Sequence, residues 1–337
     1  MSDGLPLPGF VNAHSHAFQR ALRGKVEGGD FWAWRESMLD LARGLGPDGV
    51  REGYAEVYRE MKAAGYTAVG EFHYVGFAEG QAAVEAGAEA GVELVLLPAA
   101  YGRGGIDRFR QGSAAEYLEQ VEALRAAGAA VGVAPHSVRA CPREWLVEIG
   151  RFAAAERLPL HIHVDEQPRE IEECLAEHGC RPIELLERTG CLGPHVTVVH
   201  ATHADGAELD LLAQSGTTVC ACPTTEADLA DGFLPAARIE HRRIPLCIGS
   251  DSNARIDPLE ELREVEGIAR RQTGTRGVFS TERLLCFGAD EGGRSLALES
   301  WPDIEVDLEH PSLRGVAPDD VFDALVSSCS ADVVASS

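Results

Sequence analysis

Short apolar segments recur along this chain, and helix-like segments separate most of them. The apolar segments span residues 9–16, 67–74, 92–99, 130–137, 158–166, 196–203, 217–224 and 245–252. Their nearly continuous hydrophobicity indicates parallel strands that are covered on both faces. The clearest helix-like segments between them span residues 51–65, 78–91, 114–128, 143–157 and 207–216. Eight alternating units predict an α/β protein of the (β/α)8 TIM barrel type rather than an open doubly wound sheet.

The chain has 337 residues, which suits one barrel with a small addition. We expect the barrel to occupy residues 1–280 and a small C-terminal appendage, partly strand, to occupy residues 281–337. The appendage would include the strand-like residues 301–308 and the apolar residues 321–326. Between the first two strands, a longer segment that contains FWAWRESM predicts a loop and helix near the active site. No G-x-G-x-x-G motif follows the first apolar segment, which argues against dinucleotide binding.

The formal net charge of −24 makes nucleic acid an unfavourable partner and repels anions at long range. An anionic substrate would therefore need arginine or lysine side chains inside the pocket. The N-terminal sequence MSDGLPLPGF does not resemble a secretory signal, and no apolar run reaches the ~18 residues of a membrane span. We expect a cytoplasmic protein without a membrane partner.

The nine cysteines are scattered and odd in number, which predicts reduced and mostly buried thiols. Cys220 and Cys222 could form a metal pair. A lone Cys-x-Cys within a strand is more often part of the core, and we favour that interpretation.

Pairs of histidines two residues apart lie at the ends of two predicted strands. His14 and His16 are two residues apart at the end of the first strand, so their side chains share a face. Barrel active sites lie at this end of the strands. On the fifth strand, His163 is the outermost histidine and the better metal ligand. We expect His161 to be its buried, hydrogen-bonded neighbour.

The sixth and eighth strands end at His200 and Asp251, and Glu166 lies just past the fifth. Three imidazoles and one carboxylate leave a coordination position open, as in a catalytic metal site. We expect one divalent ion, with zinc favoured over iron(II) or manganese(II), which would also accept these ligands. Asp251 would also accept a proton from the attacking water. The predicted metal ligands are His14, His16, His163 and Asp251.

Several motifs together resemble the formimidoylglutamate deiminases of the amidohydrolase superfamily. The resemblance extends from residue 9 to about residue 265. The His-x-His and Ser-Asp motifs fit the whole superfamily, whereas HAFQR, FWAWRE and PHSVR are narrower signals. The other matching stretches are YTAVGEFHY, HIHVDEQ, VVHATH, CPTTEADLADG and IGSDS.

The resemblance implies hydrolysis of N-formimino-L-glutamate to N-formyl-L-glutamate and ammonia, a step of histidine degradation. It implies that Glu166 moves protons and that His200 steadies the attacking water or the new oxygen. The implied substrate-holding residues are Gln19, Arg35, Tyr74, His136 and Arg139, of which His136 also counts among the catalytic residues. Two arginines suit a substrate with two carboxylates, because a guanidinium both balances the charge of a carboxylate and fixes its position.

Two other functions stay open at this point. A related deaminase that acts on a purine, pyrimidine or other cyclic C=N substrate would need no pair of arginines, and an inactive metal-binding barrel would have no substrate. The family usually has a β-rich segment before the first barrel strand, and we expect it here to be absent or reduced. This difference leaves the exact substrate and the interface of a homodimer open.

Overall fold

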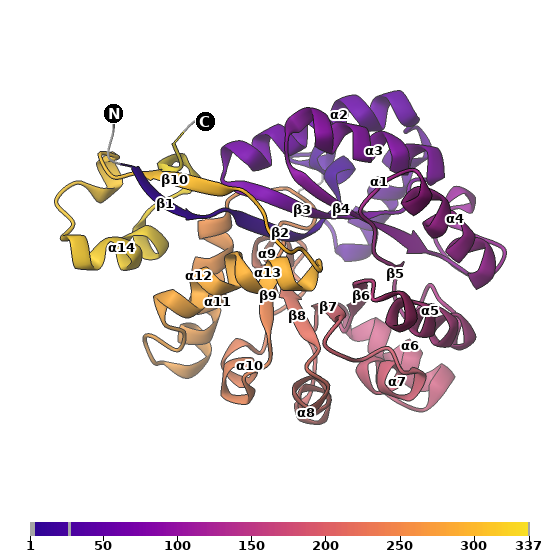
Figure 1. Cartoon of the computed structure of the whole chain (residues 1–337). Helices are drawn as coiled ribbons and strands as arrows, with labels where there is room; N and C mark the ends of the chain where they lie inside the picture. The colour runs from indigo at the N-terminus through magenta and orange to yellow at the C-terminus, as the bar shows by residue number, and fades with distance from the viewer. Residues whose placement is uncertain (1–3, 26–27, 336–337) are drawn as a thin grey trace.

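Eight parallel strands form the centre of the computed structural model, which describes residues 4–25 and 28–335 (Figure 1). Residues 1–3, which begin the N-terminal sequence discussed above, lie outside the described part. The eight strands match the eight apolar segments in order. They are β2 (Phe10–Ser15), β3 (Tyr66–His73), β4 (Glu93–Ala100), β5 (Ala134–Pro135), β6 (Leu160–Val164), β7 (Val196–His200), β8 (Thr218–Ala221) and β9 (Leu246–Ile248).

The strands pair in chain order in two groups, β2-β3-β4-β5 and β6-β7-β8-β9. Parallel bridges between Val133 and Leu160 and between Ser137 and His163 join the two groups on one side. A parallel bridge between Ser15 and Asp251 joins them on the other. The strands therefore close into a barrel, and the predicted fold class is confirmed.

Helices follow the strands and cover the outside of the barrel (Figure 1). The capping of α8 shows how the local sequence sets their limits. Asp205 accepts hydrogen bonds from the backbone N–H groups at its start, and Gly216 ends it with a left-handed φ of 69°. The helices of the barrel are α1 (Phe31–Arg43), α2 (Pro47–Ala63), α3 (Phe77–Ala90), α4 (Ala114–Ala126), α5 (Arg143–Glu156), α6 (Pro168–His178), α7 (Pro182–Thr189), α8 (Gly206–Ser215), α9 (Pro223–Asp228), α10 (Ala236–Arg242) and α11 (Pro258–Thr273).

A small two-stranded sheet lies beside the barrel, where both ends of the described chain meet (Figure 1). Strand β1 (Gly4–Pro8) pairs antiparallel with β10 (Asp303–Asp307), so the strand expected at 301–308 is present. The apolar residues 321–326 instead belong to a helix, α14 (Val321–Ser328). The short helices α12 (Thr281–Gly288) and α13 (Asp290–Ser295) precede β10.

Buried side chains fill the barrel and anchor these C-terminal elements to it. His161 Nε2 lies 2.9 Å from the carbonyl oxygen of Ser295, at the end of α13, so His161 is the buried, hydrogen-bonded residue that we expected. All nine cysteines are free thiols and eight are buried, as predicted. Cys220 and Cys222 pack with Cys247 in a small apolar cluster.

Within residues 4–25 and 28–335, no helix combines the length and the apolar composition that crossing a membrane requires.

Candidate metal centre and active site

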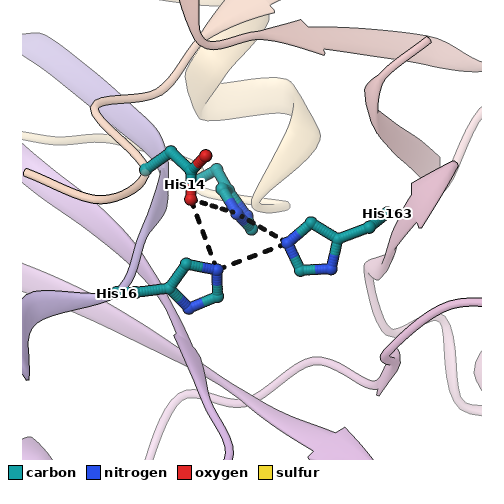
Figure 2. Close-up of side chains that lie close together, drawn as sticks. His14, His16 and His163 are labelled. Atoms are coloured by element: carbon teal, nitrogen blue, oxygen red, sulfur yellow. Dashed lines mark hydrogen bonds and ion pairs between the residues drawn. The ribbon is translucent and has the colours of Figure 1, made fainter. Parts of the chain in front are cut away.

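Three histidines and one aspartate from three regions of the chain direct their donor atoms toward one point. His163 Nε2 lies 3.1 Å from His14 Nε2 and 3.3 Å from His16 Nε2. Asp251 Oδ1 lies 3.5 Å from His14 Nε2 and 3.4 Å from His16 Nε2. The three rings point toward one another in Figure 2. Ligands bonded at about 2.0–2.2 Å to one ion are separated by about 3–3.5 Å, so these separations fit one metal ion.

The outer nitrogens of two rings fix which nitrogen faces the centre. His16 Nδ1 lies 2.7 Å from the carbonyl oxygen of Phe72, and His163 Nδ1 lies 2.9 Å from that of His136. A ring that donates its Nδ1 proton to a carbonyl presents the Nε2 lone pair. Burial lowers the pKa of His14 to about 3 and lowers the pKa values of His16 and His163 as well. Neutral lone pairs facing each other at this distance repel unless a cation lies between them.

The ends of β2 and β9 hold these donors in place. His16 N donates to the carbonyl oxygen of Asp251 at 2.8 Å, and Asp251 N donates to that of His14 at 3.0 Å. Asp251 has a φ of 46°, a left-handed conformation that is unusual for a residue other than glycine. Such backbone strain is typical of functional sites whose surroundings enforce it.

Glu166 and His200 lie beside the donors. His200 Nε2 is 3.7 Å from Glu166 Oε1 and 3.8 Å from Asp251 Oδ2. Burial raises the pKa of Glu166 to about 7, although His200 and Arg139 lower it. For His200, burial lowers the pKa, but the neighbouring carboxylates outweigh it and raise the pKa to about 10. A carboxyl group that titrates near neutrality is suited to accept and return a proton.

Three of the predicted substrate-holding residues lie next to the donors. These three residues are Gln19, Tyr74 and His136. Gln19 Nε2 donates to the Tyr74 hydroxyl at 2.7 Å. Gln19 and Tyr74 are almost fully buried, whereas His136 is partly exposed. The Tyr74 ring lies 5.1 Å from that of His16 and 5.7 Å from that of His136. The His136 ring in turn lies 4.8 Å from that of His163. Gln19, Tyr74 and His136 therefore form one wall beside the donors.

The two predicted arginines differ in their contacts. Arg139 lies near Glu166, with Nη2 3.6 Å from Oε2, and its side chain is 16% exposed. Arg35, on α1, lies 3.6 Å from the carboxylate of its neighbour Glu36. Burial lowers the pKa of His136, and the positive charges of Arg139 and Arg35 lower it further.

A cavity of about 440 Å³ opens at this end of the barrel, a size that suits a small molecule. Its lining includes Gln19, the α1 residues Phe31 and Trp34, and Ser252, which follows Asp251 in the sequence, but none of the four donors. Neither Arg35 nor Arg139 is part of its described lining.

Two buried carboxylates were absent from the predicted site. Glu170 Oε1 lies 3.6 Å from Arg139 Nε, and Glu226 Oε1 lies 3.4 Å from His200 Nδ1. Glu170 follows Glu166 by one helical turn, and this spacing could have indicated a shared surface. Glu226 lies four residues after Cys222, just past the seventh barrel strand. The only indication of its role in the sequence was that it belongs to the matching stretch CPTTEADLADG.

The chain is similar to one family of known proteins along most of its length. The profile of the amidohydrolase family matches residues 6–287. The chain belongs to the amidohydrolase family. This assignment agrees with the resemblance seen in the sequence, and it covers every residue of the site described above.

Proteins similar to this chain include two kinds of deaminase. A formimidoylglutamate deiminase from Pseudomonas aeruginosa is 38% identical to this amidohydrolase over an alignment of 292 residues, and the match covers 78% of this chain and 64% of that protein. The chain therefore spans less than two thirds of that relative. A 5-methylthioadenosine/S-adenosylhomocysteine deaminase from Haloarcula marismortui is 32% identical over 308 residues, which are 89% of this chain and 70% of that protein.

Solved structures share the fold. The crystal structure of an amidohydrolase from Brucella melitensis superposes with a TM-score of 0.86 at 28% sequence identity. The match covers 98% of this chain and 84% of that one. The small sheet formed by β1 and β10 is therefore included in a superposition that spans nearly the whole amidohydrolase.

Proposed function

We propose that this amidohydrolase is a metal-dependent hydrolytic deaminase that converts N-formimino-L-glutamate and water to N-formyl-L-glutamate and ammonia. The observation that carries the proposal is the position of Arg139, a largely buried arginine 3.6 Å from Glu166, which in turn lies 3.7 Å from His200. A fixed positive charge at this point suits a substrate whose carboxylate lies near its reacting carbon. The identity with the Pseudomonas aeruginosa deiminase supports the same substrate.

His14, His16, His163 and Asp251 would hold one divalent ion, for which zinc suits three imidazoles and a carboxylate. When bound, such an ion supplies Lewis-acid chemistry and makes water nucleophilic near neutral pH. The other functional groups of the site come from the protein. Glu166, whose pKa is about 7, accepts a proton from the attacking water.

The proposed reaction then proceeds in two steps. The oxygen of water forms a bond to the formimino carbon, and His200 Nε2, 3.8 Å from Asp251, stabilises the charge on the oxygen by donating a hydrogen bond. Glu166 next delivers its proton to the terminal nitrogen. Asp251 accepts the second proton of the former water as the carbonyl forms, and this proton also passes to the terminal nitrogen, so that the carbon–nitrogen bond breaks and ammonia leaves. The new carbonyl oxygen belongs to the formyl group of the product.

The predicted wall residues would bind the rest of the substrate. Gln19 and Tyr74 form one hydrogen-bonded unit and His136 lies beside them, so their polar atoms can orient the formimino group. Arg35 and Arg139 would each contact one carboxylate of the dianion. Arg139 would reach the substrate by exchanging its long contacts to Glu166 and Glu170 for a direct one.

A second candidate is deamination of a purine nucleoside, which the identity with the Haloarcula marismortui protein favours. The experiment that separates the two supplies the zinc-loaded protein with N-formimino-L-glutamate or with 5-methylthioadenosine and measures ammonia. We expect release from the first substrate, and Glu166→Gln should abolish it. Ammonia from the nucleoside alone would overturn the proposal, and no ammonia from either substrate would favour a barrel without this catalytic activity.

A further inference from the structure

We propose that Glu226 is a positioning residue that holds His200 with its Nε2 atom toward the metal donors. This inference rests on the proposed hydrolytic function of the site, because it assigns the orientation of His200 to a group that touches neither substrate nor metal. Glu226 lies on α9, just past β8, and both Glu226 and His200 are 1% exposed.

Hydrogen bonds fix the carboxylate of Glu226 on its own helix. Cys222 N donates to Glu226 Oε1 at 3.0 Å, and Glu226 N donates to the carbonyl oxygen of Cys222 at 2.9 Å. Asp231 N also donates to the carbonyl oxygen of Glu226 at 2.9 Å. The side chain and the backbone of Glu226 are both bonded, so the carboxylate is a rigid point of attachment.

His200 is held from its Nδ1 side. Its Nδ1 lies 3.4 Å from Glu226 Oε1, while its Nε2 has no hydrogen-bond partner among the described residues. Nε2 instead lies between Glu166 Oε1 at 3.7 Å and Asp251 Oδ2 at 3.8 Å. A carboxylate that accepts the Nδ1 proton fixes both the orientation of an imidazole and the nitrogen left for chemistry. Without Glu226, neither would be determined.

A purely structural role for Glu226 would consist only of accepting the N–H of Cys222. Glu226→Gln separates the two roles, because the amide oxygen can still accept that N–H while the side chain can no longer hold a negative charge toward Nδ1. Glu261→Gln is the matched control. Glu261 is equally buried and accepts two hydrogen bonds from Thr224 on the same helix, but no described contact joins it to His200.

The experiment measures kcat and KM for ammonia release, together with bound metal, in the zinc-loaded variants. We expect Glu226→Gln to lower kcat by about 10²- to 10⁴-fold, as loss of a histidine-orienting carboxylate does elsewhere, with KM and metal content nearly unchanged. Glu226→Asp should recover part of kcat, and Glu261→Gln should keep it. Equal kcat values in Glu226→Gln and Glu261→Gln would overturn the proposal.

A second readout is independent of turnover. A buried imidazole N–H bonded to a carboxylate gives a low-field proton resonance, which His200→Gln would identify by its loss. We expect Glu226→Gln to move this resonance upfield, because the amide oxygen accepts the N–H without a negative charge, and Glu261→Gln to leave it in place. An unchanged resonance in Glu226→Gln would disprove the contact. If the wild-type protein released no ammonia, the proposed function would fail, while the resonance would still test the attachment of His200.

Discussion

Arg139 lies between two buried carboxylates, with Nη2 3.6 Å from Glu166 Oε2 and Nε 3.6 Å from Glu170 Oε1. Neither contact is short enough for a hydrogen bond, and Arg139 Nε has no partner among the described residues. The guanidinium is therefore neutralised by its surroundings yet free to bind a further carboxylate. In a chain with a large negative charge, this arrangement would let the site receive the proposed anionic substrate.

Removal of Arg139 should weaken substrate binding more than it slows the chemical step. We expect Arg139→Ala to raise KM for N-formimino-L-glutamate by about 10²-fold, because a charge-assisted hydrogen bond contributes about 1.5–3 kcal/mol. Steady-state kinetics measures this change. Arg151→Ala, at an exposed arginine on α5, is the control and should behave as wild type. An unchanged KM in Arg139→Ala would mean that no carboxylate binds there.

Trp32 on α1 lies between two arginines from other regions. Its ring lies 5.7 Å from Arg139 Cζ and 4.5 Å from Arg169 Cζ. We expect Trp32→Ala to raise KM by about 2- to 5-fold, since such cation–π contacts contribute about 0.5–1 kcal/mol at exposed sites. Trp32→Phe should recover part of the loss. The idea fails if Trp32→Ala and wild type bind substrate equally well.

Removal of the metal should destabilise the folded protein. Four donors bind the ion only in the folded state, so saturating metal adds about 4 kcal/mol at a thousand times Kd. Thermal unfolding should show that a chelator lowers the Tm of the wild-type protein and leaves the Tm of His163→Gln unchanged. His161→Gln, which alters the other histidine of β6, should still respond to the chelator. A response in His163→Gln equal to that of wild type would contradict the donor set.

Gly249 is a steric requirement of the donor site. A Cβ atom at this residue would lie 2.7 Å from the carbonyl oxygen of His14 and 2.7 Å from its Cβ. We expect Gly249→Ala to displace the end of β2 and to reduce bound metal, as elemental analysis would show. Gly267→Ala is the control, because its Cβ would approach only the flexible end of Arg271, at 3.5 Å, and alanine favours the helix. Full metal content in Gly249→Ala would show that the strand end can shift.

Glu71 should make stability depend on pH. Burial raises its pKa to about 8, although a hydrogen bond from Ala17 N opposes this. Since the folded pKa exceeds the unfolded value, the contribution of Glu71 is complete below about pH 4.5 and is lost as pH rises through about 8. Glu71→Gln should therefore be more stable than wild type by a few kcal/mol near pH 9 and similar near pH 5. Urea unfolding at both values measures this, with the exposed Glu93→Gln as control. A pH-independent difference would contradict the assignment.

The sequence predicted the barrel and its donor set because both follow from local patterns. Eight apolar segments could be counted, and the period of two placed His14 and His16 on one face. Contacts between distant segments were not predictable in this way. Nothing near Glu226 indicates that α9 brings it to His200, and β1 becomes a strand only because β10, almost 300 residues later, pairs with it. The sequence also left open which element residues 321–326 would form, since a short and largely apolar run fits helix and strand equally.

The pairing of β1 with β10 also brings the two ends of the described chain together. Val306 of β10 pairs with Leu5 on one side and with Val334 on the other. Two strand spacings, about 10 Å, therefore separate the segments that contain the first and last described residues. A linker of a few residues could join them, and the chain could be reopened at an exposed turn such as Gly128, between α4 and β5. A circularly permuted protein of this kind would keep every strand of the barrel intact while changing the order in which the strands are synthesised.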